Sequence, residues 1–191
     1  MRVAINAMLV ATFLSSCVVS IKVRTQPSNV SQLSTAETFI DAFYSFDSAR
    51  LLAILSPTSE SIPSITYYQG WAEGGNYKII DRKACEIKAV DVVSCSITVE
   101  DDPMLALGID FKVTDTFEIT FSDNEIASVE TSSNDMQVYY DAYDWVRENL
   151  PELVREPCQG YFDGGPTPAD CARVMALGYA RFAASSDFPQ Q

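Results

Sequence analysis

The stretch FKVTDTFEITF, residues 111–121, alternates apolar and polar side chains almost throughout. This alternation is typical of a β-strand with one buried face, because successive side chains of a strand point to opposite faces of the sheet. Asp115 has the parity of the apolar residues, so its carboxylate is expected on the buried face. A charge in that position must be paired, hydrogen-bonded or open to a water-filled cavity. The chain is therefore expected to contain a sheet whose inner face carries an acid.

Two further β-like runs, residues 77–88 and 92–101, precede this stretch and are joined by a tight connection near Val90. If paired residue numbers in that hairpin sum to 180, Cys85 faces Cys95 directly. The four cysteines other than Cys17 permit three pairings, and this register favours Cys85 with Cys95 and Cys158 with Cys171. Each bridge would stabilise the fold by about 3 kcal/mol. Residues 122–125, SDNE, form a turn into another strand.

Helical patterns lie on both sides of the strands. Ser34 opens a capping-box pattern, and Asp47 has the form of a cap for a second helix that Pro57 ends. Residues 66–76 are expected to form a short helix or loop rich in aromatic residues. After the strands in the sequence, a helix is expected from a cap at Asn134 to Pro151. A last helix is expected from Thr167 and Pro168 to about residue 184. This order of elements indicates a segregated α+β fold with antiparallel strands.

Composition narrows the range of functions. A length of 191 residues with 47% hydrophobic residues is enough for one domain with a substantial core. The net charge of −13 argues against a nucleic-acid partner and against direct binding to anionic lipid surfaces. The chain has no histidine, which excludes Ser-His-Asp and Cys-His catalysis. Because C-x-x-C pairs and glycine-rich phosphate loops are also missing from the sequence, we expect neither a metal nor a cofactor.

The first residues have the pattern of an export signal. Arg2 precedes an apolar run over residues 3–14 that is too short to span a bilayer comfortably. The next residues, LSSC, end at Cys17 and resemble the bacterial lipobox, whose cysteine receives diacylglycerol and becomes the mature N-terminus. Ordinary secretion and a retained anchor are the alternatives. We expect a signal peptide over residues 1–17, a flexible tether over residues 18–33, and a location in the cell envelope with only the lipid in the membrane.

The segment AFYSFDSARLLAILSP, followed by an aromatic helix and long strands, resembles the nuclear transport factor 2-like and SnoaL-like superfamily. CEIKAVDVVSCSITVEDD, DTFEITFSDNEIASV and the tail PTPADCA are similar to an exported lipoprotein branch of it. The resemblance implies a cone-shaped α+β domain over residues 34–150, with N-terminal helices packed on a curved antiparallel sheet. Residues 151–191 would then form a C-terminal helical extension that contains a disulfide.

The same resemblance implies a pocket between the sheet and the helices. Asp115 would point into this pocket, and Tyr67, Tyr68 and Trp71 would line its mouth. In the competing interpretation the three aromatic residues pack in the core. Asp115 would then be structural, either paired with Arg82 or Lys83 or capping a bulge at the sheet rim, and Asp115→Asn should lower the melting temperature. Asp101 and Asp102 are expected to serve a turn or a helix cap.

From these observations we expect an exported, lipid-anchored domain that binds a small apolar ligand or an envelope protein without catalysis. The alternative is an isomerase or lyase in which Asp115 is the acid or base and a nearby tyrosine polarises an oxygen. No second catalytic residue is fixed by spacing, so the sequence favours the first interpretation.

Overall fold

One curved antiparallel sheet organises the fold in a computed structural model that describes residues 29–55, 57, 59–159 and 169–189. The strand order is β1 (Lys78–Arg82), β3 (Val92–Glu100), β4 (Val113–Ser122) and β5 (Glu125–Ser133). Strand β2 (Glu86–Ala89) pairs with the beginning of β3, and β1 pairs with its end, so β1 and β2 follow one another along the same edge of β3. Together with the helices, this sheet makes an α+β fold.

The predicted hairpin register is confirmed. Glu86 pairs with Ser94 and Ile87 with Val93, and both sums equal 180. The structure contains the disulfides Cys85–Cys95 and Cys158–Cys171, as expected. Disulfides are typical of an oxidising extracellular or periplasmic environment.

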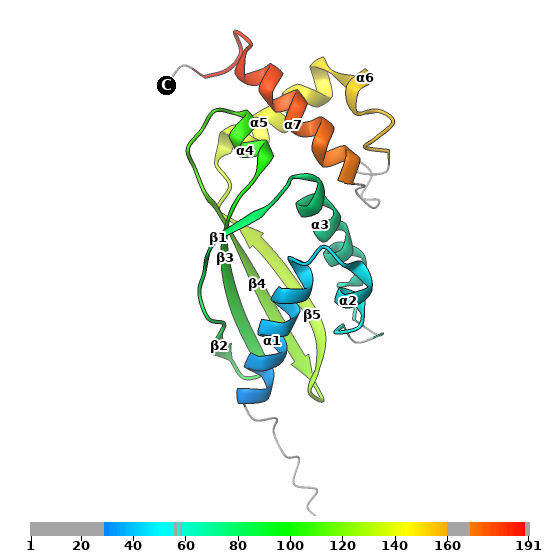
Figure 1. The fold of residues 1–191 in the computed structure, drawn as a ribbon, viewed down its shortest axis with the longest axis vertical. Coiled ribbons are helices and arrows are strands. Elements are labelled where there is room, and N and C mark those ends of the chain that lie inside the picture. The colour runs from blue at the N-terminus through cyan, green and yellow to red at the C-terminus, as the bar shows by residue number, and fades with distance from the viewer. Residues whose placement is uncertain (1–28, 56, 58, 160–168, 190–191) are drawn as a thin grey trace, which may run out of the picture.

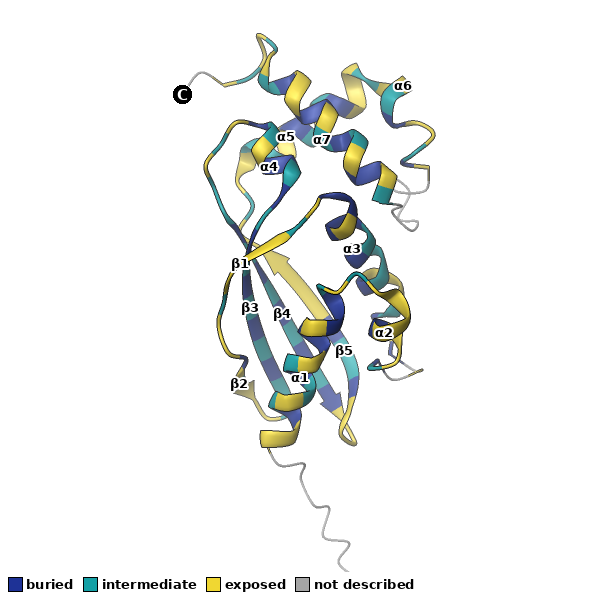
Figure 2. Ribbon diagram, viewed as in Figure 1, coloured by how far each residue is buried: buried dark blue, intermediate teal, exposed yellow. Residues whose placement is uncertain are grey.

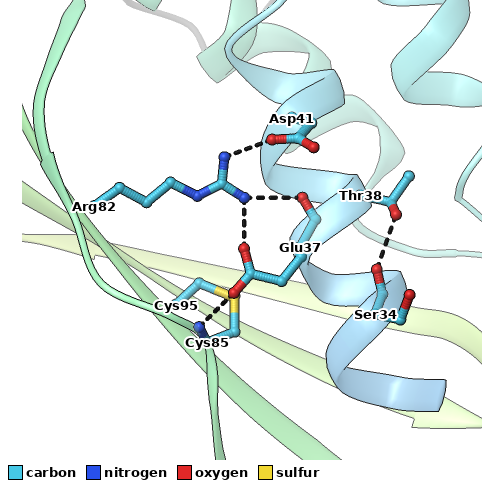
Figure 3. The surroundings of a disulfide bond; sticks show 7 residues. All are labelled: Ser34, Glu37, Thr38, Asp41, Arg82, Cys85 and Cys95. Carbon is cyan, nitrogen blue, oxygen red and sulfur yellow. Dashed lines mark hydrogen bonds and ion pairs between the residues drawn. A yellow bond between two sulfur atoms is a disulfide. The ribbon is translucent and has the colours of Figure 1, made fainter. Parts of the chain in front are cut away.

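The expected single strand over residues 77–88 is interrupted, and this part of the prediction was wrong. The backbone N–H of Cys85, which lies between β1 and β2, donates at 2.6 Å to the Glu37 carboxylate of helix α1 (Asn29–Phe43) and not to β3 (Figure 3). A bulge between Ile79 and Asp81 shifts the register of β1 further. The edge strand is therefore broken by a contact with a helix far away in the sequence.

Seven helices are present in the described part of the chain. Helices α1 (Asn29–Phe43), α2 (Ser48–Leu52) and α3 (Ile62–Gly74) lie beside the sheet (Figure 1). Helices α4 (Asp102–Ala106), α5 (Gln137–Asn149), α6 (Pro151–Val154) and α7 (Ala169–Ala183) gather beyond one end of the strands. The N-terminal end of α1 lies at the opposite end of the molecule (Figure 1).

Two predicted helix starts were wrong, and each has a long-range cause. Helix α1 begins at Asn29 and not at Ser34, so residues 29–33 of the expected tether are helical. Its first turn is held by buried Gln32, whose Nε2 donates to the Asp91 carboxylate in the β2–β3 turn at 2.8 Å. Helix α5 begins at Gln137, because the Asn134 side chain accepts the Thr114 N–H at 2.6 Å and does not cap the helix.

Other local predictions were met. The Asp47 carboxylate caps α2 by accepting the N–H groups of Ala49 and Arg50. Asp101 caps α4 by accepting the Met104 N–H at 2.8 Å. Pro151 follows the end of α5 and begins α6. The expected cap of the last helix, Thr167 with Pro168, lies outside the described residues.

The core lies between the sheet and the helices beside it. The inward residues of β3 and β4 are buried, whereas the opposite face is partly exposed (Figure 2). Rings of α1, of the turn directly after it, of α3 and of β4 fill the space over the sheet with edge-on and stacked contacts between Phe39, Phe43, Tyr44, Tyr68 and Phe117. The interior over β4 is therefore packed with aromatic side chains.

Candidate functional site

A partly open pocket of about 190 Å³ lies where the end of β5 meets α3 and the beginning of α5. Its lining is Tyr68, Trp71, Tyr77, Thr131, Ser132, Ser133, Asp135 and Tyr139. Four aromatic rings thus face three hydroxyl-bearing residues and one carboxylate. Pockets for drug-sized ligands measure about 300–1,000 Å³, so this pocket suits a small ligand.

The local structure explains which side chains reach the pocket. Tyr68 and Trp71 are three residues apart on α3 and share one helix face. Tyr67 is not among the lining residues, because adjacent positions on a helix point in different directions. The segment from Thr131 to Asp135 follows the last buried residue of β5, Val129, and carries no large apolar side chain. Two of the four residues expected at a pocket, Tyr68 and Trp71, are therefore found together in its wall.

Asp115 is buried in the core next to the pocket and does not line it. It has the inward parity that its sequence position predicted and is only 1% exposed. It is not among the lining residues, because its carboxylate turns toward the aromatic core, where Oδ2 accepts the Tyr44 hydroxyl at 2.8 Å. Its other oxygen, Oδ1, has no well-formed hydrogen bond among the described residues. Asp115 is thus a buried acid that is satisfied on one side only.

The environment of Asp115 favours its neutral form. Burial raises the pKa of Asp115 to about 6. Hydrogen-bonding interactions with the hydroxyls of Tyr68 and Tyr44 oppose this rise, and the charge of Asp135 adds to it. Tyr68, whose ring lines the pocket, therefore connects Asp115 to it.

The expected ion pair of Asp115 with Arg82 or Lys83 is absent from the described residues. Arg82 contacts α1 instead, where its guanidinium binds Glu37 and Asp41 at 2.5 Å each (Figure 3). This arrangement attaches the outer strand β1 to α1 next to the Cys85–Cys95 bridge. The structure gives Asp115 two tyrosines as neighbours in place of a cation.

Two further acids lie near the same pocket. Burial raises the pKa of Asp101 to about 7, the hydrogen bond from the Met104 N–H lowers it, and the charges of Asp135 and Asp115 raise it. Burial also raises the pKa of Asp135, while the Ser133 hydroxyl, which donates to its carboxylate, lowers it. The three acids therefore disfavour one another's ionised forms.

The tyrosines of the pocket are neutral hydroxyls. Burial is the largest cause that raises the pKa values of Tyr68, Tyr77 and Tyr139 well above the ordinary range, and the nearby aspartates raise them further. They can donate or accept hydrogen bonds, but they cannot act as bases near neutral pH. No group of three or more cysteine or acidic residues in the described ranges is arranged to hold a metal ion.

Sequence reasoning missed Tyr44, Tyr77, Asp135 and Tyr139. Tyr139 lies in the helical pattern between Asn134 and Pro151, where the spacing predicts packing, and Tyr44 and Tyr77 have no periodic signal that distinguishes them. The run TSSND at residues 131–135 offered a signal, because a strand that ends in small hydroxyl side chains followed by an acid leaves room beside a neighbouring aromatic helix.

Comparisons with known proteins add little to the site. The chain matches no known family profile and no curated protein. Among solved structures it is similar to a Xanthomonas campestris protein of unknown function with a cystatin-like fold. That match has 18% sequence identity and a TM-score of 0.45, and it covers 56% of this chain and 92% of the other. None of the helices in the described ranges has the length and apolar character needed to cross a membrane.

Proposed function

We propose that this protein is an exported domain that binds a small molecule, without catalysis, in the pocket between α3, β5 and α5. The observation that carries the proposal is the lining itself, in which four aromatic residues, three hydroxyl-bearing residues and one carboxylate border a partly open space of about 190 Å³. Aromatic walls with a few placed polar groups are the usual construction of small-ligand sites. Because hydroxyls and a carboxylate share the wall, the proposed ligand carries polar groups and is not purely apolar.

The cone-shaped nuclear transport factor 2-like architecture is part of this proposal. The curved antiparallel sheet with α1 and α3 beside it supports that assignment. Lipid attachment at Cys17 and a location in the cell envelope are also proposed. The support is the LSSC sequence and the two disulfides, which fit an oxidising compartment. An envelope protein as partner is the less favoured alternative, because the pocket offers a defined site for a small molecule.

An isomerase or lyase reaction at Asp115 is the second candidate function. The raised pKa of Asp115 and the neighbouring tyrosine hydroxyls favour it, because an acid with a pKa of about 6 can exchange a proton near neutral pH. Against it, Asp115 is 1% exposed and lies outside the pocket lining. A base must come within about 3 Å of the proton that it removes. The binding function therefore ranks first.

A thermal-shift screen tests the binding proposal with sets of cationic, anionic, neutral polar and apolar compounds. Thr131→Trp should block the pocket, because Thr131 pairs with buried Phe117 on the inward face of the sheet, and Ser128→Trp on the outward face of the same strand is the control outside the lining. We expect a compound that raises the melting temperature of the wild type and of Ser128→Trp, but not that of Thr131→Trp. If no set stabilises the wild type, the binding proposal is wrong. Turnover of a bound carbonyl compound that is lost in Asp115→Asn would favour the enzyme instead.

A further inference from the structure

We propose that the ligand of this pocket is a small organic cation that carries an alkylammonium group. This inference rests on the proposed binding function and specifies its ligand class. It is argued from the aromatic wall, from the carboxylate in that wall and from the acids behind it.

The aromatic wall is the first step. Tyr68, Trp71, Tyr77 and Tyr139 come from α3, the segment before β1, and α5, so their rings border the same space from different elements. The face of an aromatic ring carries negative electrostatic potential and attracts cations, and a set of such rings is a recurrent site for quaternary ammonium groups. An apolar ligand would pack against the rings equally well, so the charge of the site has to distinguish a cationic ligand from an apolar one.

The charge of the pocket is negative. Asp135 is the only ionisable carboxylate in the lining, and none of the lining residues in the described ranges is basic. Its carboxylate accepts a hydrogen bond from the Ser133 hydroxyl, which fixes its position at the end of β5. An anionic ligand would therefore meet like charge without a compensating cation, whereas an ammonium group would be paired.

Two buried acids near the pocket add to its negative electrostatic potential in their ionised forms. Asp101 and Asp115 are 2% and 1% exposed, and no ion pair neutralises either of them within the described residues. Asp115 is linked to the pocket through Tyr68, and its Oδ1 has no well-formed hydrogen bond within the described residues. Asp101 acts on the pocket tyrosines Tyr77 and Tyr139 through its charge. A bound cation would offset the repulsion among the three acids, which gives cations an advantage that neutral ligands lack.

The position of the pocket favours a free cation over a lipid head group. The pocket lies toward the end of the molecule where α4 to α7 gather, and the beginning of α1 lies at the other end (Figure 1). If the chain is attached to a membrane through Cys17, the attachment reaches the domain at the beginning of α1, the end remote from the pocket. The overall charge of −13 also attracts soluble cations and opposes close approach to anionic lipids.

Calorimetric titration of the full chain in a non-ionic detergent tests the inference with choline as the probe. 3,3-Dimethyl-1-butanol has the same shape as choline without the charge, so it separates charge from packing. We expect choline to bind at least 10-fold more tightly than the neutral isostere. Equal affinity for both would overturn the cation inference and leave the small-molecule pocket in place. Absence of any choline binding would also overturn it, and the thermal-shift screen then decides separately whether other compounds bind.

Variants locate the site. Asp135→Asn should weaken choline binding at least 10-fold, while Asp141→Asn, an exposed change of equal charge on α5, should stay within 2-fold of the wild type. Equal weakening by both variants would overturn the inference, because it would show a general charge effect. Tyr139→Phe keeps the ring and should retain binding, and a loss there comparable to Asp135→Asn would contradict the cation–ring contact. Pelleting with phosphatidylcholine vesicles that is lost in Asp135→Asn, without binding of free choline, would overturn the free-cation assignment in favour of a lipid surface.

Discussion

Asp115 is a charged residue type placed on the buried face of β4 without a cation beside it in the described structure. Its neighbours are the Tyr44 hydroxyl at 2.8 Å and the Tyr68 hydroxyl, both from the helical side of the core. Tyrosine hydroxyls stabilise a carboxylate less than an ion pair would, and burial therefore prevails and raises the pKa of Asp115 from 3.8 to about 6. The salt bridge expected from the sequence would have had the opposite effect.

This environment reverses the expected effect of Asp115→Asn. Because the pKa of Asp115 is higher in the folded state, its contribution to stability is fully present below about pH 4 and is lost as the pH rises to about 6. Asn removes the buried charge and keeps an acceptor for Tyr44. We expect the variant to have a higher free energy of unfolding than the wild type at pH 8, by about 2–3 kcal/mol, and a similar one at pH 4.

Chemical denaturation at both pH values measures this difference. Asp141→Asn is the control, since it removes the same charge from an exposed position and should change stability little at either pH. A variant at Asp115 that is less stable than the wild type at pH 8 would contradict the assignment of Asp115 as an unneutralised buried acid.

Among the elements, α5 and α7 approach each other closely at one glycine. Gly178 is buried in α7, and a Cβ atom at this position would lie 2.6 Å from Val146 Cγ2 of α5. The two helices can therefore pack at this distance only if residue 178 has no side chain. The contact belongs to the helical group at the end of the sheet, which also supplies Tyr139 to the pocket.

Gly178→Ala should destabilise the protein. Overpacking costs about 1–3 kcal/mol, and the higher helix propensity of alanine offsets up to about 1 kcal/mol of it. We expect a net loss of about 1–2 kcal/mol in the free energy of unfolding. In a double-mutant cycle with Val146→Ala, the double variant should be less destabilised than the sum of the single variants, because the smaller residue leaves room for the added methyl. Additive losses would show that the two side chains do not collide.

The elements also show what the sequence could predict. Strands β3, β4 and β5 followed from alternation, and the parity of Asp115 and the Cys85–Cys95 bridge followed from register, because these signals are local or separated by one hairpin. The break between β1 and β2 depends on Glu37, which lies 48 positions before Cys85. The start of α1 depends on a contact between Gln32 and Asp91 across 59 positions. Interactions of this range leave no period in the sequence.

The candidate site was predictable to a similar extent. Aromatic density on one helix indicated Tyr68 and Trp71, and both line the pocket. Tyr139 and Asp135 border the same space because α5 begins beside the end of β5, and the run TSSND was the one sequence signal for room at this place. The sequence therefore indicated one wall of the site, and the other wall required the tertiary structure.

At the scale of the whole molecule, the acidic surface and the arrangement of the ends bear on where the protein is held. With a net charge of −13 the domain is repelled by anionic lipid surfaces. The described residues contain no helix able to cross a bilayer. A lipid at Cys17 would attach the protein through the segment before α1, and α1, the first described element, begins at the end of the molecule remote from the pocket (Figure 1).

We predict that Cys17 carries this attachment. Residue 17 lies outside the described residues, and the prediction rests on LSSC directly after the apolar run. Labelling with a fatty-acid analogue in the native host should mark the wild type and not Cys17→Ala, because the variant lacks the thiol to which the lipid is attached. Ser16→Ala keeps a small residue before the cysteine and should be labelled like the wild type. Equal labelling of the wild type and Cys17→Ala would show that the labelled group is attached to another residue. The proposed attachment at the end of the molecule remote from the pocket would then lose its support.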